Sequence, residues 1–184
     1  MRVLFLHPNF PAQYRHVTTA LAGVRGNQVV FGTARAEGEL PHVLKAVFKP
    51  HRAPRHDTHP YIRPVETAVL NGQGVFRLAQ ALKARGFVPD VICAHSGWGV
   101  SLYVKDAFPA ARLLSYFEWY YHASGSDADF LPGETTSDDD KLRIRTKNAP
   151  VLLDLAQCDR GLCPTGWQRE QFPEVFRDRL RCYA

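Results

Sequence analysis

Short apolar runs alternate along the chain with longer stretches in which apolar residues recur at helical spacing. The short runs lie at residues 3–7, 28–31, 43–48, 91–94, 112–117 and 160–163. They are too short for helices and rich in β-branched and aromatic residues, so they predict strands. The longer stretches, at residues 13–24, 62–85, 99–108, 137–157 and 167–172, predict helices. This alternation predicts an α/β protein with an open, mostly parallel sheet and helices on both faces.

Two of the helical stretches leave their continuity open. Gly72 and Gly74 interrupt residues 62–85, which form either one kinked helix or two helices. In residues 137–157, Pro150 marks a kink or a restart. Ser137 is a good helix cap. Residues 160–163 predict the last complete strand, and residues 176–184 resemble the approach to a further strand.

The stretch from Asp90 to Gly99 is the centre of the pattern. Its apolar run, residues 91–94, predicts a strand that is buried on both faces of a parallel sheet. Polar and flexible residues follow at once, beginning with His95. In open α/β sheets, ligands bind beyond the carboxyl ends of the strands, and a histidine there can donate, accept or titrate. The other interpretation is a partly buried histidine that closes a turn.

The loop after the first strand, residues 7–13, contains no glycine. It therefore lacks the G-x-G-x-x-G and GxxxxGK[ST] patterns, which argues against an NAD or FAD dehydrogenase and against a P-loop protein. The loop still leads into a helix amino terminus, which favours anions. Asn9 and Gln13 are the side chains best placed to touch a ligand, although Asn9 could equally shape the turn.

A cluster of aromatic residues with one carboxylate, residues 118–122, follows the strand at residues 112–117. Because the carboxyl ends of parallel strands meet at one edge of a sheet, we expect Glu118 and His95 on the same edge. Aromatic rings beside a carboxylate commonly hold a sugar ring, and they equally often close the end of a domain.

Composition sets outer limits on these interpretations. A chain of 184 residues with 45% apolar and 22% charged residues is typical of one ordinary globular domain. The net charge is +5, but the chain has no basic tail, so we expect no nucleic-acid partner. Four cysteines without a CxxC pair and the lack of a leader or membrane span predict a cytoplasmic location.

Residues 49–55 form a basic, proline-broken loop. It could face phosphates or anionic lipid head groups, which would place the protein at the periphery of the inner membrane, or it could simply be solvated. The spacing of His51, His56 and His59 matches no recognised metal pattern, so we expect no metal.

Four ordered segments together resemble the amino-terminal half of a bacterial family 4 glycosyltransferase. They are residues 9–16, 94–99, 117–121 and 164–173, which read NFPAQYRH, AHSGWG, FEWYY and PTGWQREQFP. The resemblance implies the glycosyltransferase-B architecture of two Rossmann-like domains facing a cleft, of which residues 1–184 form one. It also implies a retaining transfer of a sugar from a nucleotide-diphosphate sugar, without a bound metal or other cofactor.

The same resemblance implies roles for individual residues. His95 matches the histidine that touches the donor sugar at the cleft, and we expect it to be catalytic. The residues expected to bind substrate are Asn9, Phe10, Gln13, Ser96, Gly97, Trp98, Glu118, Tyr120 and Tyr121. The chain departs from the family at Ala12, where relatives often have glycine.

The second departure is one of length. Relatives continue past Arg181 into a donor-binding domain, which this sequence lacks, so we expect the chain alone to transfer no sugar. The acceptor would be a sugar or a lipid-linked glycan. The chain would need a second domain or subunit, or form a homodimer through its cleft face. The alternative is a non-catalytic sugar- or nucleotide-binding or partner module on a Rossmann-like scaffold.

Overall fold

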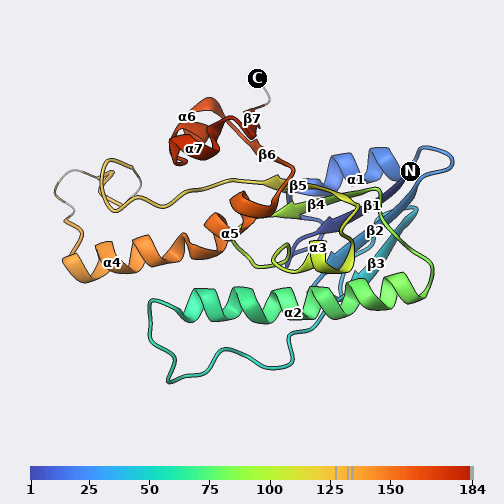
Figure 1. The fold of residues 1–184 in the computed structure, drawn as a ribbon, viewed down its shortest axis with the longest axis horizontal. Coiled ribbons are helices and arrows are strands. Elements are labelled where there is room, and N and C mark those ends of the chain that lie inside the picture. Colours follow the sequence, from blue (N-terminus) through green and yellow to red (C-terminus); the bar gives the residue numbers. More distant parts are fainter. Residues whose placement is uncertain (127, 132, 134, 183–184) are drawn as a thin grey trace.

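The computed structural model describes residues 1–126, 128–131, 133 and 135–182. Its strands are β1 (Arg2–Leu6), β2 (Gln28–Thr33), β3 (Val43–Val47), β4 (Val91–His95), β5 (Arg112–Tyr116), β6 (Arg160–Cys163) and β7 (Leu180–Cys182). They form one parallel sheet in the order β3-β2-β1-β4-β5-β6-β7 (Figure 1). The predicted fold class is confirmed, and residues 160–163 are not the last strand because β7 completes the approach seen after residue 176.

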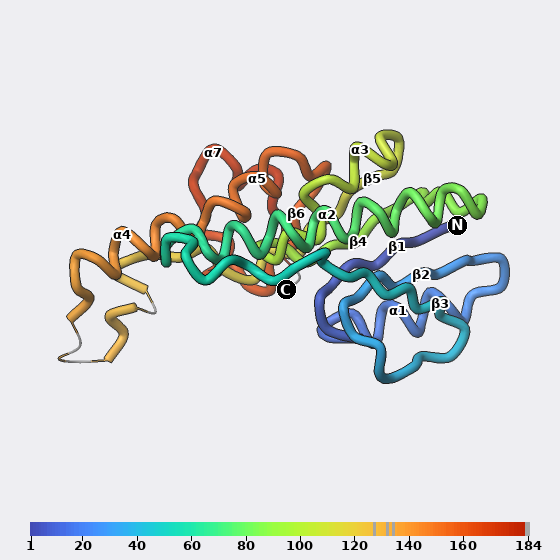
Figure 2. Tube along the Cα trace, turned by 90° about the horizontal axis from the view of Figure 1, so that it is seen from below, coloured from blue at the N-terminus to red at the C-terminus, as the bar shows by residue number. Residues whose placement is uncertain are grey.

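Helices cover the two faces of the sheet unequally. They are η1 (Ala12–Tyr14), α1 (Arg15–Ala22), α2 (Arg63–Ala84), α3 (Val104–Ala107), α4 (Asp138–Lys147), α5 (Ala149–Gln157), α6 (Gly166–Glu170) and α7 (Glu174–Arg177). Figure 2 shows α1 on one side of the sheet and α2, α3 and α5 on the other. The larger core lies under α2, α3 and α5, where Leu4 and Leu6 point, and a smaller cluster with Val3 and Phe5 lies under α1.

This asymmetry corrects one prediction about β4. Ile92 and Ala94 are fully buried, but Cys93 on the opposite face is only half-buried. The reason is that η1 and α1 cover this face over β1 and β2 and leave an apolar hollow beside Cys93. The strand is therefore buried on one face and partly open on the other.

The glycines of α2 permit close packing and do not break the helix. The helix runs without interruption from Arg63 to Ala84. A Cβ atom on Gly72 would lie 2.9 Å from the Gly99 carbonyl oxygen, and one on Gly74 would lie 3.1 Å from the Lys49 carbonyl oxygen. The first contact holds α2 directly against the turn that follows β4.

The turn after β4 is longer than expected. A helix was predicted over residues 99–108, but α3 covers only Val104–Ala107. Gly97 and Gly99 adopt positive φ angles of 85° and 82°, which carry the chain through a left-handed turn before a helix can begin. Residues 99–103 remain a series of turns packed against α2.

The segment after residue 137 follows its sequence signals. Ser137 caps α4, since its Oγ accepts from the Asp140 N–H at 3.1 Å. Pro150 lies in the first turn of α5, so it marks the restart of a second helix.

No helix of the described residues is long and apolar enough to cross a bilayer.

Candidate functional site

Side chains from three separate segments meet at the carboxyl edge of the sheet. His95 ends β4, Glu118 follows β5, and Gln13 comes from η1 after β1. The His95 Nε2 lies 3.2 Å from the Glu118 Oε2, and the Gln13 Nε2 lies 3.4 Å from each of these two atoms. His95 is 5% exposed, whereas the Glu118 side chain is 47% exposed, so the cluster is held by the fold but open to a ligand.

Hydrogen bonding gives the two nitrogens of His95 different roles. Nδ1 lies 2.9 Å from the Ser96 carbonyl oxygen, which can only accept, so this contact requires a proton on Nδ1. Nε2 then faces Glu118 and Gln13. In the neutral ring it accepts from the Gln13 amide, and in the protonated ring it donates to the Glu118 carboxylate. The pair can therefore hold or pass a proton at Nε2.

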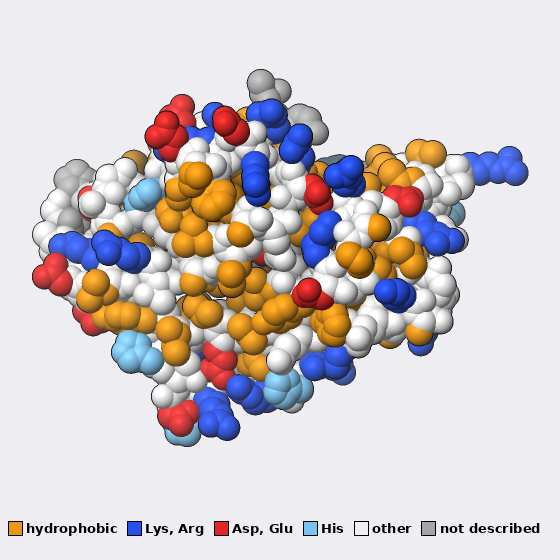
Figure 3. All heavy atoms as spheres, in the orientation of Figure 1, with side chains coloured by type: hydrophobic (Ala, Val, Ile, Leu, Met, Phe, Trp, Pro, Cys, Tyr) orange, Lys and Arg blue, Asp and Glu red, His pale blue; other side chains and the backbone are white. Residues whose placement is uncertain are grey.

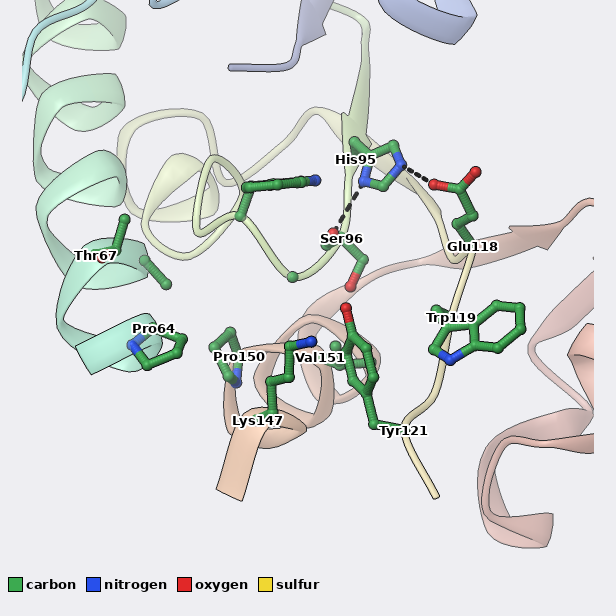
Figure 4. A pocket seen from close by; sticks show the side chains of 13 residues that line it. Pro64, Thr67, His95, Ser96, Glu118, Trp119, Tyr121, Lys147, Pro150 and Val151 are labelled. Atoms are coloured by element: carbon green, nitrogen blue, oxygen red, sulfur yellow. Dashed lines mark hydrogen bonds and ion pairs between the residues drawn. The ribbon is translucent and has the colours of Figure 1, made fainter. Parts of the chain in front are cut away.

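Two cavities border this cluster. One, of about 390 Å³, lies between the amino-terminal turns of α2 and α5 (Figure 4). The other, of about 480 Å³ and more open, lies toward the loop after β1. His95, Trp98 and Glu118 line both, so they form the partition between the two.

The cavity between α2 and α5 is mostly apolar with one cation. Figure 4 shows Pro64 and Thr67 on one wall, with Tyr121, Lys147 and Pro150 on another. The Lys147 Nζ lies 3.9 Å from the centre of the Tyr121 ring, a cation–π contact that holds the ammonium at this wall. Trp119, which also lines the cavity, carries a buried Nε1 without a partner among the described residues.

The structure places most of the predicted site residues around these cavities. Ser96, Gly97 and Tyr121 line the cavity between α2 and α5, and Asn9, Phe10 and Gln13 line the more open one. The side chain of Tyr120 instead packs against Phe172 and the larger core. Ser96 is buried, and its hydroxyl donates to Asp154 at 2.9 Å.

The loop after β1 has a mixed role. The Asn9 N–H donates to the His7 Nδ1 at 2.8 Å and its Oδ1 accepts from the Arg35 Nε at 3.3 Å, so Asn9 shapes the turn and borders the cavity as well. Phe10 packs edge-on against Phe31. Ala12 adopts a φ of 49°, in the left-handed region that glycine adopts most readily.

Sequence reasoning missed His7, which the pattern placed at the junction of the first strand and the loop after it and gave no role. Its Nδ1 accepts from the Asn9 N–H, so its proton lies on Nε2. Its ring meets the His95 ring edge-on, with centroids 4.8 Å apart. Burial, and secondarily His95, lowers the pKa of His7 to about 4, and the contact between its Nδ1 and the Asn9 carbonyl oxygen opposes this shift. His7 is therefore neutral at physiological pH and a donor beside the catalytic candidate.

Acidification is expected to destabilise the fold through His7. Between its ordinary pKa of 6.5 and about 4, the unfolded chain binds a proton that the folded chain excludes, so stability falls as the pH falls. Chemical denaturation measures how much free energy of unfolding is lost over this pH range. We expect that loss to be roughly 2 kcal/mol smaller in His7→Gln than in the wild type. His16→Gln, on the exposed side of α1, should keep the wild-type loss. Identical pH dependence of His7→Gln and the wild type would contradict this assignment.

Among the described residues, no group of three histidine, cysteine, aspartate or glutamate side chains is placed to hold a metal ion.

The family model of the glycosyl transferase family 4 group matches the chain over residues 25–184. No curated protein matches at a significant level.

Solved structures share the fold at low sequence identity. Os79 from O. sativa in complex with UDP has a TM-score of 0.60 at 10% identity, over 98% of this chain and 50% of that chain. A UDP-glucosyltransferase from Polygonum tinctorium capable of glucosylating indoxyl has a TM-score of 0.55 at 10% identity, over 99% and 50%. A putative UDP-N-acetylglucosamine 2-epimerase from Listeria monocytogenes has a TM-score of 0.51 at 12% identity, over 92% and 41%. The chain spans about half the length of these structures.

Proposed function

The chain belongs to the glycosyl transferase family 4 group, and from this membership we propose that it is the acceptor-side half of a retaining glycosyltransferase. The donor would be a nucleotide-diphosphate sugar, with no bound metal or other cofactor. The observation that carries the proposal is the meeting of His95, Glu118 and Gln13 within 3.4 Å at the carboxyl ends of neighbouring parallel strands.

Each member of the cluster has a role that its contacts support. The His95 Nε2 hydrogen-bonds to a hydroxyl of the transferred sugar and supports charge that develops as the leaving group departs. Glu118 and Gln13 hold neighbouring hydroxyls. Trp98, a residue that is 48% exposed at the partition, offers a ring face for a sugar.

The two cavities suggest a division between the substrates. We assign the acceptor to the cavity between α2 and α5, because Trp119, Tyr121 and Pro150 supply flat apolar surface there. The donor sugar would lie on the more open side, over Asn9 and Phe10. The partition residues would then contact the reacting atoms of both.

The proposal extends to partners. Because the chain spans about half of the structures that it resembles, the donor would be held by a second domain or subunit, or by a second copy across the cleft. The acceptor would be a sugar or a lipid-linked glycan, met in the cytoplasm at the inner membrane. Exposed basic residues of the loop at 49–62, along the lower edge of Figure 3, would contact anionic lipids.

Lys147 is expected to favour an acceptor that carries an anionic group. Its ammonium lies at the wall of the acceptor cavity, so a phosphate bound there would gain a charge-assisted hydrogen bond. We expect Lys147→Met to weaken binding of a hexose phosphate about tenfold, measured by calorimetry. Binding of the neutral hexose should change little.

Lys141→Met is the matched control, since Lys141 lies on the same helix and pairs with Asp138 away from the cavity. An equal loss for the neutral hexose, or the same loss in both variants, would refute a specific anion contact at Lys147.

A binding and transfer experiment tests the proposed function. The purified chain is mixed with UDP-, GDP- and ADP-sugars and with sugar acceptors, while the signals of Trp98 and His95 are followed by NMR and products by mass spectrometry. We expect sugars to perturb these signals without transfer until a donor-binding half is supplied. Robust turnover by the chain alone would contradict the half-enzyme proposal, and unperturbed signals with every sugar would contradict the sugar site. Binding without transfer in a complete assembly would favour a non-catalytic module.

A further inference from the structure

Asp154 is a buried carboxylate directly behind the candidate site. It lies in α5, is 0% exposed, and joins none of the ion pairs found among the described residues. Burial raises the pKa of its carboxyl, and hydrogen bonds to the carboxylate oppose that rise. A buried carboxylate without a cation is costly, so its hydrogen bonds need an explanation.

Four donors satisfy the two oxygens of Asp154. Oδ2 accepts from the Ser96 hydroxyl and the Gly97 N–H, each at 2.9 Å. Oδ1 accepts from the Ser101 hydroxyl at 2.6 Å and from the Gln157 amide at 3.4 Å. Because the N–H groups can only donate, each oxygen faces an obligate donor, which is the environment of an ionised carboxylate.

One of these donors also connects Asp154 to His95. The peptide group between Ser96 and Gly97 turns its N–H to the Asp154 Oδ2 and its carbonyl oxygen to the His95 Nδ1, both at 2.9 Å. The two ends of a peptide group are conjugated, so a negative charge at the N–H makes the carbonyl a stronger acceptor. A single peptide group therefore lies between the carboxylate and the imidazole.

We propose that Asp154 fixes the proton of His95 on Nδ1 through the Ser96–Gly97 peptide group, so that Nε2 is the nitrogen presented to the ligand. An imidazole in water favours the opposite tautomer, with the proton on Nε2. Asp154 is thus a positioning residue, and this claim about His95 holds whether or not the proposed transfer reaction is found.

The substitution Asp154→Asn separates charge from geometry. The asparagine retains an oxygen for the Gly97 N–H but removes the negative charge, and it has the same shape. Long-range proton–nitrogen correlation spectra of isotope-labelled protein report which ring nitrogen carries the proton. We expect the Nδ1–H tautomer of His95 to dominate in the wild type. In the variant we expect the tautomer ratio to shift by about fivefold or more toward Nε2–H.

Two controls separate this link from simple support of the fold. Ser101→Ala removes a hydrogen bond to Oδ1 but leaves the Gly97 contact, so its His95 tautomer should match the wild type. Asp159→Asn removes a carboxylate that binds the Leu113 N–H, away from residues 95–97, and should also leave the tautomer unchanged.

The result that overturns the proposal is a folded Asp154→Asn protein with an unchanged tautomer ratio at His95. A shift of the same size in Ser101→Ala would also overturn it, because that would show loss of support and not loss of charge. If Asp154→Asn does not fold, the wild-type spectrum still decides: a neutral His95 with its proton on Nε2 contradicts the proposal by itself.

Discussion

Gly99→Ala is expected to lose more than about 4 kcal/mol of folding free energy, which is enough to unfold many domains of this size. A Cβ atom at this position would lie 1.9 Å from the Ala68 carbonyl oxygen and 2.4 Å from its carbonyl carbon. Both are backbone atoms of α2, so neither can rotate away. The residue also has a φ of 82°, which an L side chain adopts only at a cost. Urea denaturation followed by circular dichroism measures the loss.

Gly86→Ala is the matched control for backbone strain. Gly86 has the same φ of 82°, but a Cβ there would meet nothing within 4 Å. It should therefore lose only about 1–2 kcal/mol, the cost of the left-handed conformation. If the two variants lose equal amounts, α2 does not pack against the turn after β4 in the way that the structure describes.

His95→Ala is expected to lower the transfer rate of the complete enzyme by roughly 100- to 1,000-fold. The substitution removes the nitrogen that lies 3.2 Å from Glu118 at the partition between the two cavities. The loss should appear mainly in kcat, since the residue is expected to act on charge that develops during transfer. Steady-state kinetics with the donor-binding half supplied measures it.

The control for this variant is His16→Ala, on an exposed position of α1 remote from the cluster. It should leave kcat unchanged. A His95→Ala enzyme with normal kcat and a raised KM would show that His95 binds substrate uniformly and does not support the transition state.

The strands of this fold are readable from the sequence because parallel strands are continuous apolar runs. Residues 91–94 and 112–117 identified β4 and β5 almost to the residue. Parallel pairing then places the carboxyl ends of both at one edge, which is why His95 and Glu118 could be expected together. The cap at Ser137 was readable for a local reason, since its hydroxyl accepts from a backbone N–H three residues on.

What the sequence could not reveal depends on contacts between distant segments. Gly72 serves the close approach of α2 to the Gly99 backbone, and a glycine inside a helical pattern is equally consistent with a break. His7 looked like the end of a strand because its partners, Asn9 and the His95 ring, are defined only by the folded turn. Asp154 lies in a helical segment, and its four donors come from residues 96–101 and 157.

The partly open face of the sheet has a practical consequence for measuring these stabilities. Cys93, Leu114, Tyr116 and Leu162 line an apolar hollow of about 390 Å³ there, beside Val17 of α1. Dyes whose fluorescence increases in apolar surroundings should bind this hollow in the native protein. Dye-monitored melting curves would then begin from a high baseline and understate the transition, so an intrinsic optical signal is the better monitor of unfolding.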